Sequence, residues 1–180
     1  MKSAIQVVNP SDGNNQELYI QCKKRLQIYN QTTIDEYDKR KELLADLFKQ
    51  VGKNSYVEPP FYCDYGKNIT VGDHFYANYN CIMVDTAKIT IGSYVKLGPG
   101  VHIYCANHPL DSELRKTGVE YFQEVKIEDN VWIGGNVTIN PGITIGKNSV
   151  IASGSVVTKD IPENVLAGGN PCQIIRYLDK

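Results

Sequence analysis

Residues 125–158 read VKIEDNVWIGGNVTINPGITIGKNSVIASGSVVT, and an aliphatic residue recurs at every sixth position. A period of six fits neither the ~3.6 residues per turn of an α-helix nor the simple alternation of a strand. It is typical of a parallel β-helix, in which each hexapeptide supplies one short strand and one corner, and successive coils stack. The stretch therefore predicts a β-helix with the recurring side chains pointing inward. They are Ile127, Ile133, Ile139, Ile145, Ile151 and Val157.

The residue two positions before each recurring residue lies on the same face of its strand, so it is also expected inside. The same period extends backward through Val71, Ala77 and Met83, and two extra residues near Asp85–Thr86 then reset the register to Ile91. We expect the β-helix to begin near 57–60 and its regular pattern to end after residue 160, with QIIRYLDK as a final strand. Cys63 and Cys81 are three hexapeptides apart and are predicted to stack on adjacent coils.

The composition describes one ordinary soluble domain. The chain has 180 residues, a net charge of −1 and 42% hydrophobic residues, so nothing favours a nucleic-acid partner. No apolar run approaches the ~18 residues of a membrane span, and the first ten residues lack a signal-peptide core. The 5 cysteines form no CxxC pair. An odd number of unpaired cysteines favours reduced thiols and a cytoplasmic location.

The chain before the β-helix is predicted to be mostly helical. Residues 1–13 contain Pro and Gly and are expected to form an irregular lead-in. Apolar residues from Leu18 to Tyr29 then recur at helical spacing. A second helix is expected to start at a capping box of Thr33 and Glu36 and to stop at Gly52; its predicted apolar face is Ile34, Tyr37, Leu44, Leu47, Phe48 and Val51. Residues 1–56 therefore form a helical segment that covers the open end of a β-helix domain at 57–180.

The repeat is interrupted between about residues 104 and 124, where YCANHPLDSELRKTGVEYFQE has no period and many polar residues. A loop of this length inside a strict repeat is uncommon unless it is functional. His108 opens the loop, and Pro109 restricts the backbone before it. The 2 other histidines, His74 at a corner and His102 facing outward from a strand, are not predicted to carry chemistry.

Four stretches resemble the maltose and galactoside O-acetyltransferases, a family of hexapeptide-repeat acetyltransferases. They are NITVGDHFYANYNCIMVD (68–85), KITIGSYVKLGPGVHIY (88–104), NHPLDSELRKTG (107–118) and the segment from VWIGG to QIIR (131–176). The resemblance covers roughly 57–176. It implies a left-handed parallel β-helix, acetyl-CoA as the acyl donor, a carbohydrate acceptor and a homotrimer with each active site between two subunits. The hand rests on the resemblance alone, because general crossover preferences favour the opposite one.

The resemblance places catalysis on His108 and Asn78. The family's histidine acts as general base on the acceptor hydroxyl, its asparagine holds the reacting groups, and its tryptophan, here Trp132, lines the donor cleft. Imidazole suits this task because it titrates near neutral pH. Attack on a thioester also requires donors for the oxyanion. The sequence leaves that role open between Asn78 and a backbone N–H in the Gly98–Gly100 region.

Five further positions match the family's contacts to acetyl-CoA. Two of them, Lys159 and Arg176, are cations that suit phosphate groups, and the glycine implies a close approach of the backbone. No metal is expected. The five positions are Gly135, Ser153, Thr158, Lys159 and Arg176.

The acceptor side departs from the family pattern. Asp64 replaces the family's serine before Tyr-Gly, and the two acids of its V-D-D motif are here Asp85 and Thr86. The family's N-terminal segment with an acceptor-contacting aspartate has no clear counterpart. Acetyl transfer is therefore predicted more firmly than the acceptor, and Asp64, Asp85 and Thr86 are candidate acceptor ligands.

Three other interpretations compete with sugar O-acetylation. The acceptor is an amino sugar or an antibiotic in the first. In the second, the histidines form a zinc site like that of a β-helical carbonic anhydrase, which needs three convergent imidazoles. In the third, the chain is a non-catalytic scaffold, because a fold alone does not imply an activity.

Overall fold

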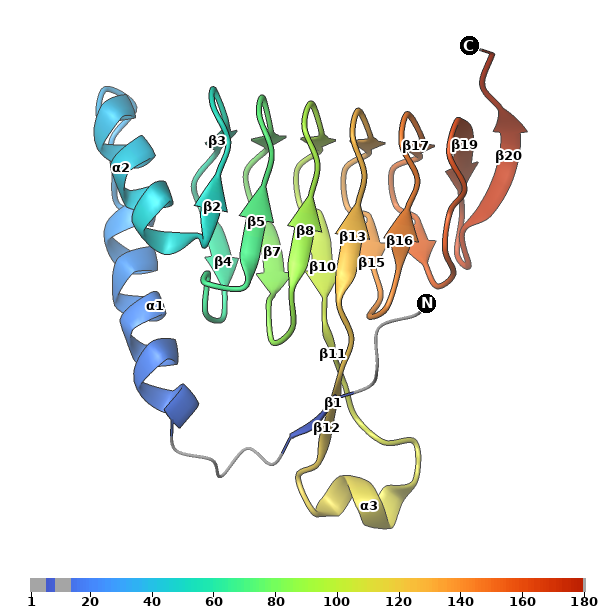
Figure 1. Cartoon of the computed structure of the whole chain (residues 1–180), viewed down its shortest axis with the longest axis horizontal. Coiled ribbons are helices and arrows are strands. Elements are labelled where there is room, and N and C mark those ends of the chain that lie inside the picture. Colours follow the sequence, from blue (N-terminus) through green and yellow to red (C-terminus); the bar gives the residue numbers. More distant parts are fainter. Residues whose placement is uncertain (1–5, 9–13, 180) are drawn as a thin grey trace.

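A computed structural model describes residues 6–8 and 14–179 of the chain. The chain winds around one axis as a β-helix, and its short strands stack into three sheets that form the sides of the rod (Figure 1). Two helices cover the first coil, and one arm extends from the side of the rod. The predicted fold class is confirmed. Sheet I consists of β2 (Gln50–Val51), β5 (Ile69–Val71), β8 (Ile89–Ile91), β13 (Val125–Ile127) and β16 (Thr144–Ile145).

Sheets II and III complete the three sides, and the chain passes from sheet I to II to III and back to I. We name the corners I–II, II–III and III–I accordingly. Sheet II consists of β3 (Tyr56–Val57), β6 (Tyr76–Ala77), β9 (Lys96–Leu97), β14 (Trp132–Ile133), β17 (Val150–Ile151), β19 (Val165–Gly168) and β20 (Gln173–Tyr177). Sheet III consists of β4 (Phe61–Cys63), β7 (Cys81–Val84), β10 (His102–Tyr104), β15 (Thr138–Ile139) and β18 (Val156–Val157).

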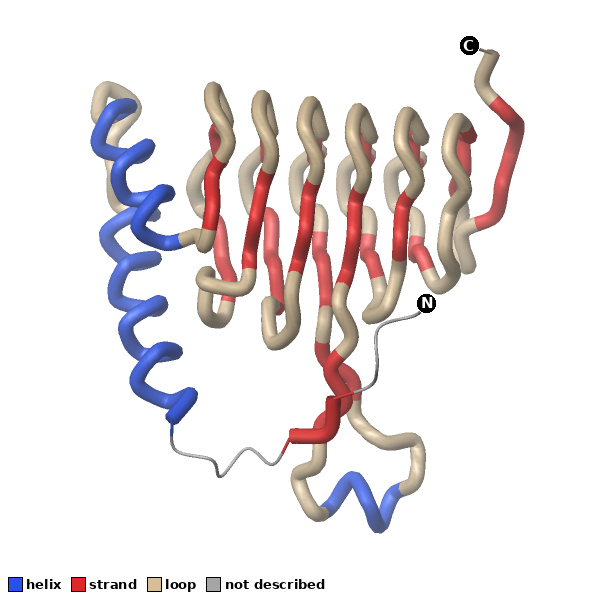
Figure 2. The backbone as a smooth tube through the Cα atoms, in the orientation of Figure 1, coloured by secondary structure: helices blue, strands red, loops and turns tan. Residues whose placement is uncertain are grey.

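The core is the stacked interior of the β-helix. Every recurring residue predicted from Ile127 to Val157 is at most 1% exposed. The two inward serines are buried as well, and each hydroxyl donates to a backbone carbonyl, Ser149 to Pro162 at 2.7 Å and Ser155 to Ala152 at 2.5 Å. The tube in Figure 2 shows how short strands alternate with corners along the whole rod.

The coils differ in length, and this corrects one prediction. Ile69 pairs with Ile89, 20 positions on, whereas Trp132 pairs with Val150, 18 positions on. The extra residues lie at corner III–I, after β4 and after β7. As a result Cys63 pairs with Met83 rather than Cys81, and the predicted cysteine stack is wrong.

Corner I–II explains why His74 is structural. One residue in each turn of this corner adopts a left-handed backbone conformation, which asparagine tolerates better than most residues. His74 occupies one of these positions with φ 56°, and its ring stacks on Tyr94 with centroids 4.7 Å apart. The residues of this corner with positive φ are Asn54, His74, Tyr94, Asn130, Asn148 and Asn164.

Helices α1 (Asn14–Asn30) and α2 (Tyr37–Leu47) cover the first coil as predicted (Figure 1). The second helix starts later than predicted, because the Glu36 carboxylate accepts the Thr33 N–H at 2.8 Å and holds the chain in a turn before Tyr37. Ile34 and Tyr37 are exposed, so the predicted apolar face is wrong at those two positions. The β-helix already begins at β2, and Gly52 follows that strand instead of ending a helix.

Both ends of the chain are more ordered than expected. Gln6–Val8 form strand β1, so the predicted irregular lead-in is wrong there, while residues 1–5 and 9–13 lie outside the described part. At the other end β19 continues the parallel stack beyond residue 160, and β20 is the predicted final strand, paired antiparallel to β19. Within the described residues, no helix has both the length and the hydropathy needed to cross a membrane.

The interruption of the repeat is an ordered arm. Strands β11 (Ala106–Asn107) and β12 (Glu120–Phe122) form an antiparallel stalk, and β1 joins the outer side of β12. Helix α3 (Ser112–Lys116) closes the tip, capped by the Asp111 carboxylate, which accepts the Leu114 N–H at 2.7 Å. The arm therefore holds its residues in fixed positions outside the rod.

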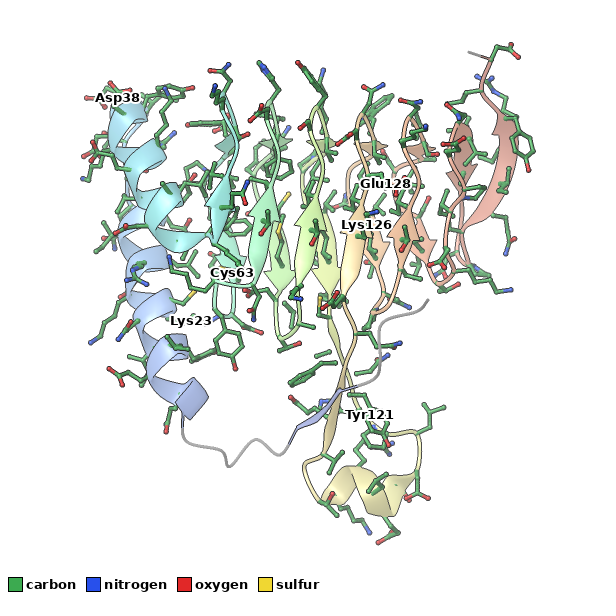
Figure 3. All side chains as sticks on the ribbon, in the orientation of Figure 1. Lys23, Asp38, Cys63, Tyr121, Lys126 and Glu128 are labelled. Carbon is green, nitrogen blue, oxygen red and sulfur yellow. The ribbon has the colours of Figure 1, made fainter. Side chains whose placement is uncertain are left out.

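The inward and outward positions of β13 provide a test of the coil. Ile127→Ala should lower the free energy of unfolding by about 2–5 kcal/mol, because it opens a cavity in a layer that cannot collapse. Lys126→Ala on the outer face should change it by less than about 0.5 kcal/mol. The outward Lys126 donates to Glu128 at 2.8 Å (Figure 3). Urea unfolding of both variants measures the difference, and equal losses would contradict the assignment of faces.

Candidate active site

The arm presents His108 outside the rod. His108 directly follows β11, and the partner strand β12 brings Glu120 beside it, with His108 Nε2 and Glu120 Oε1 3.7 Å apart. The imidazole side chain is 57% exposed and the carboxylate 29%. A hairpin thus holds His108 next to the Glu120 carboxylate, and the imidazole is exposed enough for a substrate to reach it.

Corner III–I carries the arm and the other residues predicted for the acceptor. Asp64, Asp85 and Thr86 lie at this corner on the two preceding coils, since they follow β4 and β7 of sheet III. Thr158 and Lys159 follow β18 at the same corner, on the other side of the arm, because β18 and β4 lie at opposite ends of sheet III. Both are exposed. The predicted acceptor and phosphate contacts therefore flank the base of the arm along one edge.

Asp85 organises the acceptor side of this edge. Its side chain is fully buried, and one carboxylate oxygen accepts the N–H groups of Asp64 and Tyr65, both at 2.9 Å. The N–H of Asn68 lies 3.4 Å from the second oxygen. Burial raises the pKa of Asp85 from 3.8 to about 6, and these backbone hydrogen bonds oppose the rise. Its contacts are thus to the 64–68 turn, which it shapes.

Asp64 and Thr86 have different surroundings. Asp64 forms an ion pair with Lys23 of α1 at 3.1 Å, which connects the helical cap to the acceptor side. The Thr86 hydroxyl oxygen is buried and has no hydrogen-bond partner among the described residues. A buried hydroxyl without a partner is costly, so Thr86 carries an unsatisfied polar atom at this corner.

Corner II–III gathers another part of the predicted site. Asn78 follows β6, and Gly135 and Ser153 follow β14 and β17 at the equivalent corner of later coils. The coils touch closely here, because a Cβ atom on Gly98 would lie 2.5 Å from the nitrogen of Gly135. The Asn78 side-chain oxygen accepts the Tyr79 N–H at 2.8 Å. These three predicted residues thus lie along one edge of the rod.

Trp132 and Arg176 lie on the outer face of sheet II. The register joins Trp132 to Val150, Val150 to Leu166 and Leu166 to Arg176, so these four residues form one row. Trp132 is 57% exposed and lines a shallow groove of about 550 Å³ with Tyr94 and Lys96. The groove offers an apolar wall beside a cation.

One subunit does not bring all the predicted residues together. Asn78 and His108 lie at the two edges of sheet III, whose strands of two to four residues separate them by about 7–13 Å before the arm extends farther. The donor candidates likewise extend over sheet II and both of these corners. In the described chain, the predicted site residues around Asn78 and those around His108 thus lie at separate edges of the rod.

Sequence reasoning missed Glu120 and Lys23. Glu120 reaches His108 only through the antiparallel hairpin, which has no repeat signal, and Lys23 lies in a helix whose sequence pattern indicates only its apolar stripe. Among the described residues, no three His, Cys, Asp or Glu side chains gather as ligands of a metal would.

Comparison with protein families gives two matches. A model described as the bacterial transferase hexapeptide (six repeats) matches residues 124–159. A model described as the maltose acetyltransferase hexapeptide capping motif matches residues 9–52, which include both helices of the cap. Along the sequence, one match precedes the arm and the other follows it.

Among curated proteins, a putative acetyltransferase of Saccharomyces cerevisiae is 53% identical over 88% of this chain and 81% of its own length. The galactoside O-acetyltransferase of Lactococcus lactis is 44% identical over 92% of this chain and 82% of its own.

Solved structures agree closely with the fold. A maltose O-acetyltransferase from Clostridium difficile superposes with a TM-score of 0.96 and 51% identity over 98% of this chain and 94% of that one. A galactoside acetyltransferase in complex with coenzyme A gives 0.94 and 44% over 97% and 87%. A Vibrio cholerae hexapeptide-repeat acetyltransferase complexed with acetyl coenzyme A gives 0.90 and 41% over 94% and 92%.

The buried Asp85 predicts a pH-dependent stability. Because its pKa is raised in the folded state, its contribution is fully present below about pH 4 and is lost as the pH rises through 6. The free energy of unfolding of the wild type minus that of Asp85→Asn should thus fall by about 2–3 kcal/mol between about pH 3.5 and 7. Urea unfolding of both proteins across this range measures it. A difference independent of pH would contradict the titration.

Proposed function

The chain belongs to the hexapeptide-repeat acetyltransferases and is an acetyl-CoA-dependent acyltransferase; we propose that it transfers the acetyl group to a hydroxyl of a sugar or glycoside. The names of the relatives support this acceptor, since galactoside and maltose O-acetyltransferases are among them. The observation that carries the proposal is the position of His108, an exposed imidazole held on an ordered arm between the acceptor candidates and Thr158–Lys159 of corner III–I.

His108 is the general base of the proposed reaction. A sugar hydroxyl is a weak nucleophile, so a base must remove its proton as its oxygen attacks the thioester carbonyl. The new C–O bond forms, the C–S bond breaks, and the proton held by His108 passes to the departing sulfur. The Glu120 carboxylate lies 3.7 Å from Nε2 of His108. We propose that it orients the imidazole ring when the ring is protonated.

Asn78 supplies the second catalytic group, and we propose that it does so across a subunit interface. In one chain Asn78 and His108 lie at different edges of sheet III, so a homotrimer in which edges meet would join them. The Asn78 amide or a backbone N–H at corner II–III then donates to the developing oxyanion. A complete site thus needs two copies of the chain.

The donor residues suit a long, phosphate-bearing thioester. Gly135 has no side chain at corner II–III, which allows a close approach to its backbone, and Ser153 lies on the next coil. Lys159 and Arg176 are exposed cations, and we propose that they pair with the phosphates of the donor. Thr158 adds a hydroxyl beside Lys159, and Trp132 gives an apolar wall for the chain of the donor.

The acceptor is proposed to lie on the N-terminal side of the arm. Thr86 offers the buried hydroxyl without a partner, Asp64 a carboxylate already paired with Lys23, and Asp85 the fixed turn between them. Hydroxyl and carboxylate groups of this kind recognise the neutral hydroxyls of a sugar through hydrogen bonds. The composition of this proposed site therefore favours the binding of a neutral carbohydrate.

Removal of His108 tests the mechanism. His108→Ala should lower kcat at least ~10²-fold and leave acetyl-CoA binding unchanged, because the base acts only on the acceptor proton. Turnover is measured by thiol release with a panel of glucosides, galactosides, maltose, amino sugars and aminoglycosides.

The matched control is His74→Asn, which removes an imidazole at corner I–II and keeps a residue suited to its left-handed backbone. It should retain wild-type turnover. Comparable turnover in His108→Ala would disprove the base, and a preference for amine acceptors over every sugar hydroxyl would disprove the proposed substrate class.

Trp132 gives a direct probe of the donor cleft, since it is the only Trp of 180 residues. Binding of coenzyme A should change its emission as water leaves the exposed ring. Trp132→Ala should weaken binding about tenfold, the equivalent of about 1.4 kcal/mol. If calorimetry shows equal binding by the variant and the emission stays constant, the ring lies outside the cleft.

A further inference from the structure

Two cysteines from distant parts of the chain touch at the junction of the cap and the coil. The sulfur atoms of Cys22 on α1 and Cys63 on β4 are 3.6 Å apart, and both residues are at most 2% exposed. A disulfide bond measures ~2.05 Å, so the sulfurs need to approach by about 1.6 Å to form one. Figure 3 shows Cys63 on the side of the coil that faces α1, with Lys23 beside it.

The two thiols have complementary surroundings. The hydrogen bond between the two sulfurs, in which either can be the donor, lowers the pKa of Cys22, and the charge of Lys23 acts in the same direction. The same hydrogen bond, with burial, raises the pKa of Cys63. An opening of α1 exposes Cys22, which lies on the helix, before Cys63, which stays on β4, so Cys22 is the attacking thiol. The other cysteines, whose pKa values burial raises, are Cys81 (to about 11), Cys105 (to about 12) and Cys172.

The junction keeps the pair aligned. The Lys23 ammonium group donates to the carbonyl of Cys63 at 2.6 Å and to the Asp64 carboxylate at 3.1 Å. At the other end of α1, the Asn30 side chain binds both the N–H and the carbonyl of Phe61, each at 2.9 Å. Contacts on both sides of Cys22 thus hold this helix in register with β4.

We propose that Cys22 and Cys63 are a reversible oxidation site, at which a low-molecular-weight disulfide such as glutathione disulfide converts the two thiols into an internal disulfide. The thiolate of Cys22 attacks one sulfur of glutathione disulfide, and the first glutathione leaves as a thiolate that takes up the proton of Cys63. The sulfur of Cys63 then attacks that of Cys22 and displaces the second glutathione, which is protonated by water. Two protein thiols are oxidised, and one glutathione disulfide is reduced to two glutathiones.

The bond would join the cap to the first coil across 41 positions of the chain. Because both sulfurs are buried, the exchange proceeds through transient opening of α1, and its rate reports that opening. A cross-link of this span restricts the unfolded chain and stabilises the folded one. The oxidised protein thus carries its helical cap as a covalent part of the coil.

The test is incubation of the folded protein with increasing ratios of glutathione disulfide to glutathione. Peptide mapping without reductant should show a Cys22–Cys63 cross-link, and alkylation should count two fewer thiols. The midpoint of thermal unfolding should rise by about 5–10 °C and return after dithiothreitol.

Single variants identify the roles of the two thiols. Cys63→Ser should accumulate glutathione on Cys22, whereas Cys22→Ser should leave Cys63 unmodified; the alanine variants replace either one if serine disturbs the fold. Cys172→Ser, distant from the pair, should still form the cross-link. A folded wild type that forms no cross-link at any ratio, or that stops at a glutathione adduct, would overturn the proposal.

Discussion

The structure depends on the close stacking of successive coils around inward branched side chains. Each strand of two to four residues is too short to be stable alone, and its backbone groups are paired only by the coils above and below. The period of six sets which side chains fill the interior, and small residues at the corners let the backbones meet. A Cβ atom on Gly72, for example, would lie 2.7 Å from the backbone carbon of Gly92. The rod is thus a rigid frame that fixes its edges.

The two residues proposed for catalysis lie at those edges. The flat faces present rows of outward residues, whereas corner III–I carries the arm with His108 and corner II–III carries Asn78. In the proposed mechanism, the base on the hairpin and the residues at corner II–III are complementary parts of one site. Their separation within one chain makes assembly a condition of activity in the proposed mechanism.

The sequence predicted the repeat well and the long-range contacts poorly. The inward residues from Ile127 to Val157 followed from period alone, because each hexapeptide is a local unit. Contacts that join different units carry no such signal. Glu120 reaches His108 through a hairpin, Lys23 reaches Asp64 from a helix, and the stack of Cys63 failed because two extra residues shift the register. The roles of the site residues remain predictions that the proposed variants address.

Every departure from the hexapeptide step lies at one corner. From Cys63 to Val71 and from Met83 to Ile91 the step is 8 residues instead of 6, and the arm enters after Ile103 at the same corner. Insertions there leave the pairing of all three sheets intact, as the register on both sides shows. Evolution can therefore lengthen or rebuild this single edge, which also carries His108, without any adjustment in the stacked scaffold.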